Sequence, residues 1–352
     1  MRLRRSRVDS PGLGRRRSGS GFTYLDVDGS PLRDPEQLQR CRDLVIPPAW
    51  QEVWICPTPD GHIQAVGTDD AGRRQYLYHP DWRARRDRAK HDHVLDLARA
   101  LPAARERAAV DLHRRAMPRE RALAVAFRLL DLGYFRMGSE SYARTNGSYG
   151  LATLRKEHVT IGRDGRVWFD YTAKSGQRRR IMIEDEDLLT PLSMLRRRRG
   201  GGAELLAYKR GPSWFDLTST DVNGYLKELL GPEASAKDFR TWHANVLAAV
   251  ALARVADEAR RDGRELSATA RRRAVTAAVK EVAAYLGNTP AVCRASYIDP
   301  KLLDLFERGE TVPAHIARRA YADLPDDPAV ADVEVPPSTD DTAESAVLRL
   351  LA

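Results

Sequence analysis

The hydrophobic period of the sequence changes near residue 80, and this change constrains the fold more than any other feature. After it, Ala and Leu recur at three- and four-residue spacing, as in residues 94–101, which predicts amphipathic helices. Before it, short β-rich runs are separated by Pro, Gly and Asp clusters, at residues 22–27, 53–56, 62–66 and 75–78. We therefore expect a β-rich domain over residues 21–90 and a mainly helical domain over residues 91–315.

One segment of the helical part has the pattern of strands. Residues 157–161, 166–171 and 179–183 alternate in polarity and are joined by Gly-containing turns, which predicts a three-stranded meander. We interpret the acidic cluster at residues 184–187 as a helix start favoured by the helix dipole, rather than as a metal site. The predicted fold class is α+β: a small β-rich N-terminal domain and a larger, mainly α-helical domain containing the meander.

The two ends of the chain differ in composition from the rest. Residues 1–20 contain seven arginines and one aspartate, a net charge of +6 out of +9 for the whole chain. They predict a flexible basic arm, which either adds non-specific DNA affinity or serves as a solubilising tail. Residues 316–352 are rich in Pro, Asp and Ala and end in an apolar run at residues 346–351. This composition predicts a disordered linker and a short terminal helix.

Composition and missing motifs argue against several classes of protein. No apolar run approaches the ~18–20 residues of a membrane helix, and the basic N-terminus lacks the apolar segment of a signal peptide. Cys41, Cys56 and Cys293 are widely spaced, which argues against a disulfide framework or zinc site and favours a reducing cytoplasm. The common ATP, zinc-protease and serine-hydrolase motifs are absent. The excess positive charge indicates nucleic acid as the partner.

Five polar residues stand in motif-like places in the helical part. Each also has a structural interpretation: a surface arginine, a solvated turn lysine, a helix boundary, a helix cap and a tyrosine packed in the core. The five are Arg136 in Tyr-Phe-Arg-Met-Gly-Ser-Glu, Lys174 in Thr-Ala-Lys-Ser-Gly, Arg240 in Lys-Asp-Phe-Arg-Thr-Trp-His, and Asn288 and Tyr297 within residues 286–297. Their combination is far more specific than any one of them.

In this order, and each in its local motif, the five residues resemble those of the poxvirus-like and bacterial type IB DNA topoisomerases, over residues 22–310. The resemblance implies a monomer whose two domains close around duplex DNA, with no membrane partner. Residues 73–78 are similar to the family's DNA-contacting strand, on which alternation would place Arg74, Tyr76 and Tyr78 on one face beside Gln75. Further DNA contacts are expected at Tyr142, Thr153 and Lys237.

The resemblance also implies a role for each of the five residues. Tyr297 would be the nucleophile, Arg136 and Arg240 would clamp the scissile phosphate, and Lys174 would be the general acid for the leaving 5′-oxygen. Asn288 stands where a histidine is common, and an amide can donate a hydrogen bond to a phosphate oxygen without exchanging protons.

The physical chemistry agrees with these roles. A tyrosine with a pKa near 10 needs nearby cations to favour the phenolate, and two guanidinium groups provide them. The same groups and the amide would stabilise the charge that grows on the phosphate in the transition state, so neither a metal nor another cofactor is required. Because the bond is conserved in a 3′-phosphotyrosyl intermediate, religation would need no ATP, and rotation before it would relax supercoils.

Two other functions are compatible with the sequence. A tyrosine recombinase uses similar Arg, Lys, Arg and Tyr chemistry, but it commonly carries His three residues before the second arginine, where this chain has Lys237. A non-enzymatic DNA-binding protein would bind the phosphate backbone without cutting it. Such a protein has no need for a tyrosine placed nine residues after an asparagine.

Overall fold

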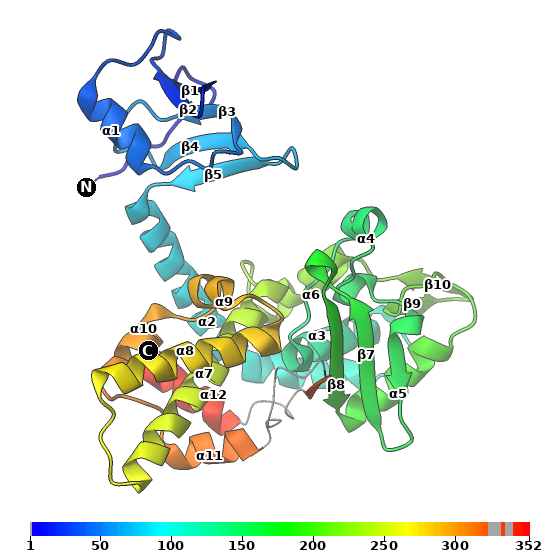
Figure 1. Ribbon diagram of the computed structural model, residues 1–352. Coiled ribbons are helices and arrows are strands. Elements are labelled where there is room, and N and C mark those ends of the chain that lie inside the picture. Colours follow the sequence, from blue (N-terminus) through cyan, green and yellow to red (C-terminus); the bar gives the residue numbers. More distant parts are fainter. Residues whose placement is uncertain (1, 323–331, 335–340) are drawn as a thin grey trace. The chain divides into compact units, whose positions relative to one another are not determined.

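The computed structural model describes residues 2–322, 332–334 and 341–352. The chain divides into two compact units, Met1–His91 and Asp92–Ala352. This division falls one residue from the domain boundary expected from the sequence. Helix α2 (Pro80–Leu112) begins in the first unit and continues in the second (Figure 1).

The first unit is an antiparallel five-stranded sheet, with strand order β2-β1-β3-β4-β5, and one helix, α1 (Pro35–Asp43). Leu13, Cys41 and Ile55 belong to its small core. All four strands expected from the sequence are present, whereas α1 was not predicted, although Asp34 caps it and Pro35 opens it. The strands are β1 (Leu13–Ser18), β2 (Gly21–Leu25), β3 (Gln51–Ile55), β4 (Ile63–Thr68) and β5 (Arg74–Tyr78).

The prediction of a flexible arm over residues 1–20 is wrong. Residues 13–18 form β1, which pairs with β2 and β3, and the Ser6 hydroxyl exchanges hydrogen bonds with the backbone of Ile63. Arg15 lies over the Phe22 ring, 4.0 Å from its centroid, and donates to three backbone carbonyls. The arginine run indicated a solvated segment, but one of its side chains holds the first unit together.

The second unit is mainly helical, with one contiguous hydrophobic core. Helix α7 (Ala236–Arg261) is buried along most of its length and carries the candidate site residue Arg240, which is buried. The helices after α2 are α3 (Arg119–Gly133), α4 (Glu140–Asn146), α5 (Glu186–Arg197), α6 (Ser219–Leu230), α7 (Ala236–Arg261), α8 (Ala268–Leu286), α9 (Pro290–Ser296), α10 (Pro300–Glu307), α11 (Ala314–Ala322) and α12 (Asp341–Leu351).

The predicted meander is present as β6 (Val159–Ile161), β7 (Arg166–Thr172) and β8 (Arg178–Glu184). Two features were not expected: β11 (Asp332–Glu334) adds a parallel fourth strand beside β8, and β9 (Ala207–Arg210) and β10 (Ser213–Asp216) form a separate hairpin. The acidic cluster does begin a helix, because the Asp185 carboxylate caps α5 by accepting from the Leu188 amide. Within the described residues no group of acidic, His and Cys side chains could hold a metal ion.

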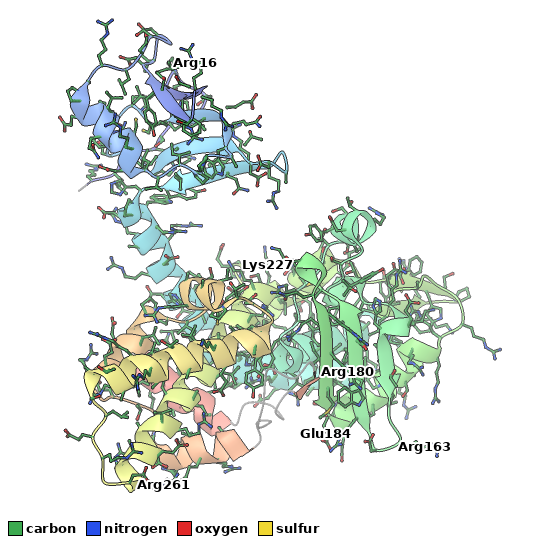
Figure 2. All side chains as sticks on the ribbon, viewed as in Figure 1. Arg16, Arg163, Arg180, Glu184, Lys227 and Arg261 are labelled. Atoms are coloured by element: carbon green, nitrogen blue, oxygen red, sulfur yellow. The ribbon has the colours of Figure 1, made fainter. Side chains whose placement is uncertain are left out.

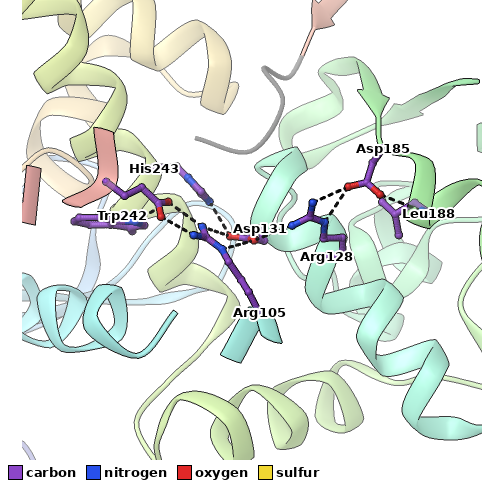
Figure 3. Close-up of polar contacts among 8 residues, drawn as sticks. Arg105, Arg128, Asp131, Asp185, Leu188, Trp242 and His243 are labelled. Atoms are coloured by element: carbon purple, nitrogen blue, oxygen red, sulfur yellow. Dashed lines mark hydrogen bonds and ion pairs between the residues drawn. The ribbon is translucent and has the colours of Figure 1, made fainter. Parts of the chain in front are cut away.

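The C-terminal segment is partly core rather than tail. Helix α11 extends the second unit beyond residue 315, and Ile316 and Ala317 are buried. The terminal helix α12 is longer than predicted, and its Glu344 accepts hydrogen bonds from Arg105 and Trp242, which Figure 3 labels. Most of the expected linker lies outside the described residues. No helix in the described ranges is long and apolar enough to span a membrane.

Candidate active site

Three arginines converge on the C-terminal end of α8. Carbonyl groups at the end of a helix have few or no intrahelical donors, and here guanidinium groups supply them for residues 284–287. The three arginines come from the loop after α3, from β8 and from α7, so the helix end joins distant parts of the second unit. The hydrogen bonds run from Arg179 to Ala284 (3.1 Å) and Tyr285 (2.6 Å), from Arg240 to Leu286 (2.8 Å), and from Arg136 to Gly287 (2.8 Å).

Arg136 is held by a close crossing of two backbone segments. Its carbonyl accepts from the Leu151 amide, and a Cβ atom at Gly150 would lie 2.5 Å from the Gly138 nitrogen. Only glycine fits at Gly150, because any side chain would collide with backbone. Burial and the neighbouring Arg240 charge lower the pKa of Arg136 to about 10, which still leaves the guanidinium charged at neutral pH.

Arg240 lies in the second turn of α7 with 3% of its surface exposed. Besides Leu286, it donates to the carbonyl of Tyr134, which ends α3 in the left-handed conformation with φ of 54°. A non-glycine residue in this region costs on the order of 1–3 kcal/mol, so the bond from Arg240 helps to hold a strained helix end.

Tyr297 follows the short helix α9 and is half-buried. The guanidinium carbon of Arg240 lies 5.3 Å from the centre of its ring. Burial by itself would raise the pKa of Tyr297, but Arg240, Arg136 and Lys237 outweigh it, so the pKa is lowered from its ordinary value. Lys237 is exposed in the first turn of α7. These contacts bring Tyr297 together with three of the cations singled out in the sequence.

Asn288 joins the same group of residues. Its Oδ1 accepts a hydrogen bond from Arg136, which orients the amide and leaves Nδ2 as a donor. Among the described residues, Asn288 Nδ2 and Arg240 Nε are buried and have no hydrogen-bond partner. A buried donor without a partner costs about 1–3 kcal/mol and points to a functional site. Either donor could bind an acceptor oxygen of an anion.

Lys174 is not brought to these residues. It is exposed in the turn between β7 and β8, where Ser175 and Gly176 adopt positive φ angles of 67° and 72°. In the described part of the chain it makes no hydrogen bond or ion pair with Arg136, Arg240, Asn288 or Tyr297. Its role as general acid therefore stays a prediction.

The predicted DNA-contacting strand has the expected alternation. On β5, Arg74, Tyr76 and Tyr78 are exposed, whereas Gln75 and Leu77 are half-buried. The Tyr76 and Tyr78 rings stack with centroids 6.1 Å apart at 19°, with 42% and 45% of their surfaces exposed. Exposed aromatic rings beside an arginine are typical of surfaces that bind nucleic-acid bases and backbone.

The two expected contacts nearer the meander differ from each other. Tyr142 on α4 is exposed, as a DNA contact requires. Thr153 is buried, and its hydroxyl accepts from the Gly150 amide and donates to the Gly150 carbonyl. The Thr153 hydroxyl therefore stabilises the turn that holds Arg136, and the expected DNA contact at this residue stays a prediction.

Arg179 and Gly287 were not among the site residues predicted from the sequence. Arg179 stood in the run Arg178-Arg179-Arg180, where charge masked the alternation that puts it on the buried face of β8 with Ile181 and Ile183. That alternation was the available signal. Gly287 ends α8 at a φ of 61°, a common role for a glycine after a helix.

Comparisons with known proteins agree with this geometry. Residues 79–313 match the family model of the eukaryotic DNA topoisomerase I catalytic core, and residues 21–69 match that of the bacterial DNA topoisomerase IB N-terminal domain. The chain is 30% identical to DNA topoisomerase 1B of Acanthamoeba polyphaga mimivirus over 301 residues, which cover 84% of this chain and 88% of that protein. It is 31% identical to DNA topoisomerase 1 of Daucus carota over 130 residues, which cover 36% of this chain and 15% of that one. The chain therefore belongs to the type IB DNA topoisomerase family.

Proposed function

We propose that this protein relaxes supercoiled duplex DNA by cutting and rejoining one strand through a covalent bond to Tyr297. The observation that carries the proposal is the Arg240 guanidinium 5.3 Å from the centre of the Tyr297 ring, together with Arg240 Nε and Asn288 Nδ2, two buried donors that have no partner in the described part of the chain. A half-buried tyrosine with a lowered pKa is a competent nucleophile, and the unpartnered donors fit a phosphate oxygen. Membership of the family agrees with this use of DNA.

In the proposed reaction, the phenolic oxygen of Tyr297 attacks the scissile phosphorus and its proton passes to solvent. The bond from phosphorus to the 5′-oxygen breaks, and Lys174 gives a proton to that oxygen, which leaves as a hydroxyl. Arg136, Arg240 and the Asn288 amide stabilise the charge on the non-bridging oxygens. The 3′-phosphotyrosyl bond keeps the energy for religation, so the cycle needs neither ATP nor a metal.

Lys174 requires a movement of its turn toward the other residues when DNA binds. The turn is exposed and contains two residues at positive φ, so few buried contacts oppose such a movement. Functional loops are commonly drawn from segments of this kind.

The DNA would be bound by residues of both units, with the protein acting as a monomeric clamp. The exposed face of β5, with Arg74, Tyr76 and Tyr78 and with Gln75 at its edge, would contact the duplex from the first unit. Tyr142 and Lys237 would contact it from the second. An enzyme with this substrate would work in the cytoplasm, in association with the nucleoid.

Relaxation of plasmid DNA tests the proposal. The protein should relax negatively and positively supercoiled plasmid in EDTA without ATP, whereas Tyr297→Phe should bind the plasmid and relax neither form. Detergent should trap a covalent complex with the intact protein and none with the variant. A protein that binds plasmid without relaxing it would reject the proposal and favour DNA binding alone. Relaxation by Tyr297→Phe would reject Tyr297 as the nucleophile.

A further inference from the structure

We propose that Arg179 is a positioning residue that holds the Asn288 amide in place for the phosphate and itself touches no DNA. The proposal rests on the proposed function, because it assigns a structural support to the same site. Arg179 lies on β8, five residues after Lys174, and its guanidinium donates to the backbone of α8 just before Asn288.

The three arginines at the end of α8 make different contacts. Arg179 is 8% exposed, and its Nη1 and Nη2 are bound to the carbonyls of residues 284 and 285. Arg240 and Arg136 bind the next two carbonyls, and Arg240 keeps a buried Nε that has no partner among the described residues. Arg179 thus fixes the helix, while Arg240 and Arg136 retain contacts to Tyr297 and Asn288.

Gly287 shows how closely Arg179 supports this turn. A Cβ atom at Gly287 would lie 2.9 Å from the Nη1 atom of Arg179 and 3.1 Å from its Cδ and Cζ atoms. The glycine therefore provides both a positive φ and the space for the guanidinium. Asn288 is the next residue, and its backbone N–H donates to the Ala283 carbonyl. Its position depends on the turn that Arg179 packs against.

Electrostatics gives a second reason for Arg179. The C-terminal end of a helix carries roughly half a negative charge, which would repel a phosphate. By donating to two of the carbonyls, Arg179 turns an electronegative helix end into one that tolerates an anion. Its own pKa is lowered mainly by burial, and it needs no carboxylate partner because the carbonyls accept its hydrogen bonds.

Arg179 also links the two segments that the proposed reaction must align. In the sheet it pairs with Tyr171 on β7, and the turn with Lys174 lies between these two residues. Through its guanidinium it reaches the turn with Asn288. One side chain therefore joins the base of the Lys174 turn to the end of α8.

The test compares Arg179→Ala, Asn288→Ala and the double variant in single-turnover plasmid relaxation. Removing one donor to a developing anion costs about 10²–10³ in rate, so displacing Asn288 should slow relaxation at least ~10-fold. Plasmid affinity should stay within about 2-fold of the parent. The double variant should be no slower than Asn288→Ala, because Arg179 acts through that amide. Losses that multiply in the double variant, or an equal loss of affinity, would overturn the proposal.

Two further variants separate positioning from folding. Arg179→Lys keeps a cation that can reach one carbonyl and should recover part of the rate. Arg180→Ala removes a charge from the adjacent position, which Figure 2 labels, and should keep the parent rate. The Arg180 guanidinium lies 4.4 Å from the centre of the Trp168 ring and makes none of the hydrogen bonds to α8 that Arg179 makes. If Arg179→Ala does not fold, the lysine variant decides. The proposal is rejected if Arg179→Lys relaxes plasmid at the parent rate. It is also rejected if Arg180→Ala loses as much of the relaxation rate as Arg179→Lys does.

The same assay distinguishes failure of this inference from failure of the proposed function. If Tyr297→Phe relaxes plasmid, the proposed function fails and Arg179 supports no such site. If Tyr297→Phe is inactive while Arg179→Ala keeps the parent rate, the function stands and the positioning role of Arg179 is rejected.

Discussion

At the scale of single residues, the site depends on cations that offset the burial of Tyr297. Burial disfavours a phenolate, and the guanidinium of Arg240 makes the largest opposing contribution. The net direction is a lowered pKa. In the proposed reaction the phenolate would be the attacking species, so a tyrosine that ionises more readily would favour it.

The lowered pKa predicts a pH dependence. The phenolate fraction of Tyr297 should rise at a lower pH than that of an ordinary tyrosine, whose pKa is near 10. Ultraviolet titration of the protein minus that of Tyr297→Phe would isolate this group. A difference curve with a midpoint above 10 would contradict the prediction. Because the folded form has the lower pKa, ionisation of Tyr297 stabilises the folded protein above the pKa of an unfolded tyrosine, and this contribution is lost as the pH falls through the folded pKa.

A second prediction at this scale concerns Lys174. Because the side chain is exposed and would act on the leaving oxygen, Lys174→Ala should slow strand cleavage about 10²–10⁴-fold and leave plasmid affinity nearly unchanged. Single-turnover cleavage and filter binding would measure the two effects. An equal loss in both would mean that Lys174 binds DNA rather than donating a proton.

The sequence predicted most of the candidate site residues but not what holds them. The motifs singled out Arg136, Arg240, Asn288 and Tyr297, and the structure brings these four together. Arg179 could not be found in the same way, because its role depends on carbonyls more than 100 residues away in the sequence. Burial of Thr153 was equally invisible, since a threonine is compatible with both a surface and a tight turn.

At the scale of helices and strands, the C-terminal helix α12 is fixed by a buried ionic group. Glu344 accepts two hydrogen bonds from Arg105 and one from Trp242, and Arg105 also forms a bidentate pair with Asp131 (Figure 3). Trp242 lies two residues after Arg240 on α7. The terminal helix therefore supports the helix that carries a candidate catalytic arginine.

Removing Glu344 should be costly for this reason. Glu344→Ala removes an acceptor from the half-buried Arg105, which keeps its pair with Asp131, and leaves the buried Trp242 donor without this partner, so it should destabilise the protein by about 1–3 kcal/mol. Glu310→Ala is the matched control: Glu310 pairs with Arg308 on the surface, where both side chains are more than half exposed, and should cost less than ~1 kcal/mol. Urea unfolding would measure both. Equal losses would show that the buried group contributes no more than a surface ion pair.

The hydrophobic periodicity of the sequence predicted most strands and helices, but not the contacts that their side chains make with distant parts of the chain. Strands of the sheet and the meander were expected because alternation is a local signal. Strand β1 was not, because arginines obscured the alternation and the carbonyls that Arg15 binds lie some 30 residues away. The docking of α12 depends on Arg105, more than 200 residues earlier, so composition alone suggested a free tail.

At the scale of the whole molecule, affinity for DNA and cleavage of DNA should be separable. The stacked tyrosines of β5 belong to the first unit, and the Tyr297 site belongs to the second. Arg74→Ala should therefore weaken binding, with a salt slope reduced by about 0.9, and leave the cleavage rate of bound DNA unchanged. Fluorescence anisotropy over a salt series would measure the slope. An unchanged slope would mean that Arg74 contacts no phosphate.

The arginine side chains at the end of α8 lose conformational freedom when the protein folds, before any DNA binds. Because backbone carbonyls already hold Arg136, Arg179 and Arg240 in the absence of DNA, the rotamer entropy of these long side chains is lost when the protein folds. Binding of a phosphate therefore does not cost this rotamer entropy a second time. In the proposed reaction, cleavage and religation would both use cations whose arrangement is set by the fold.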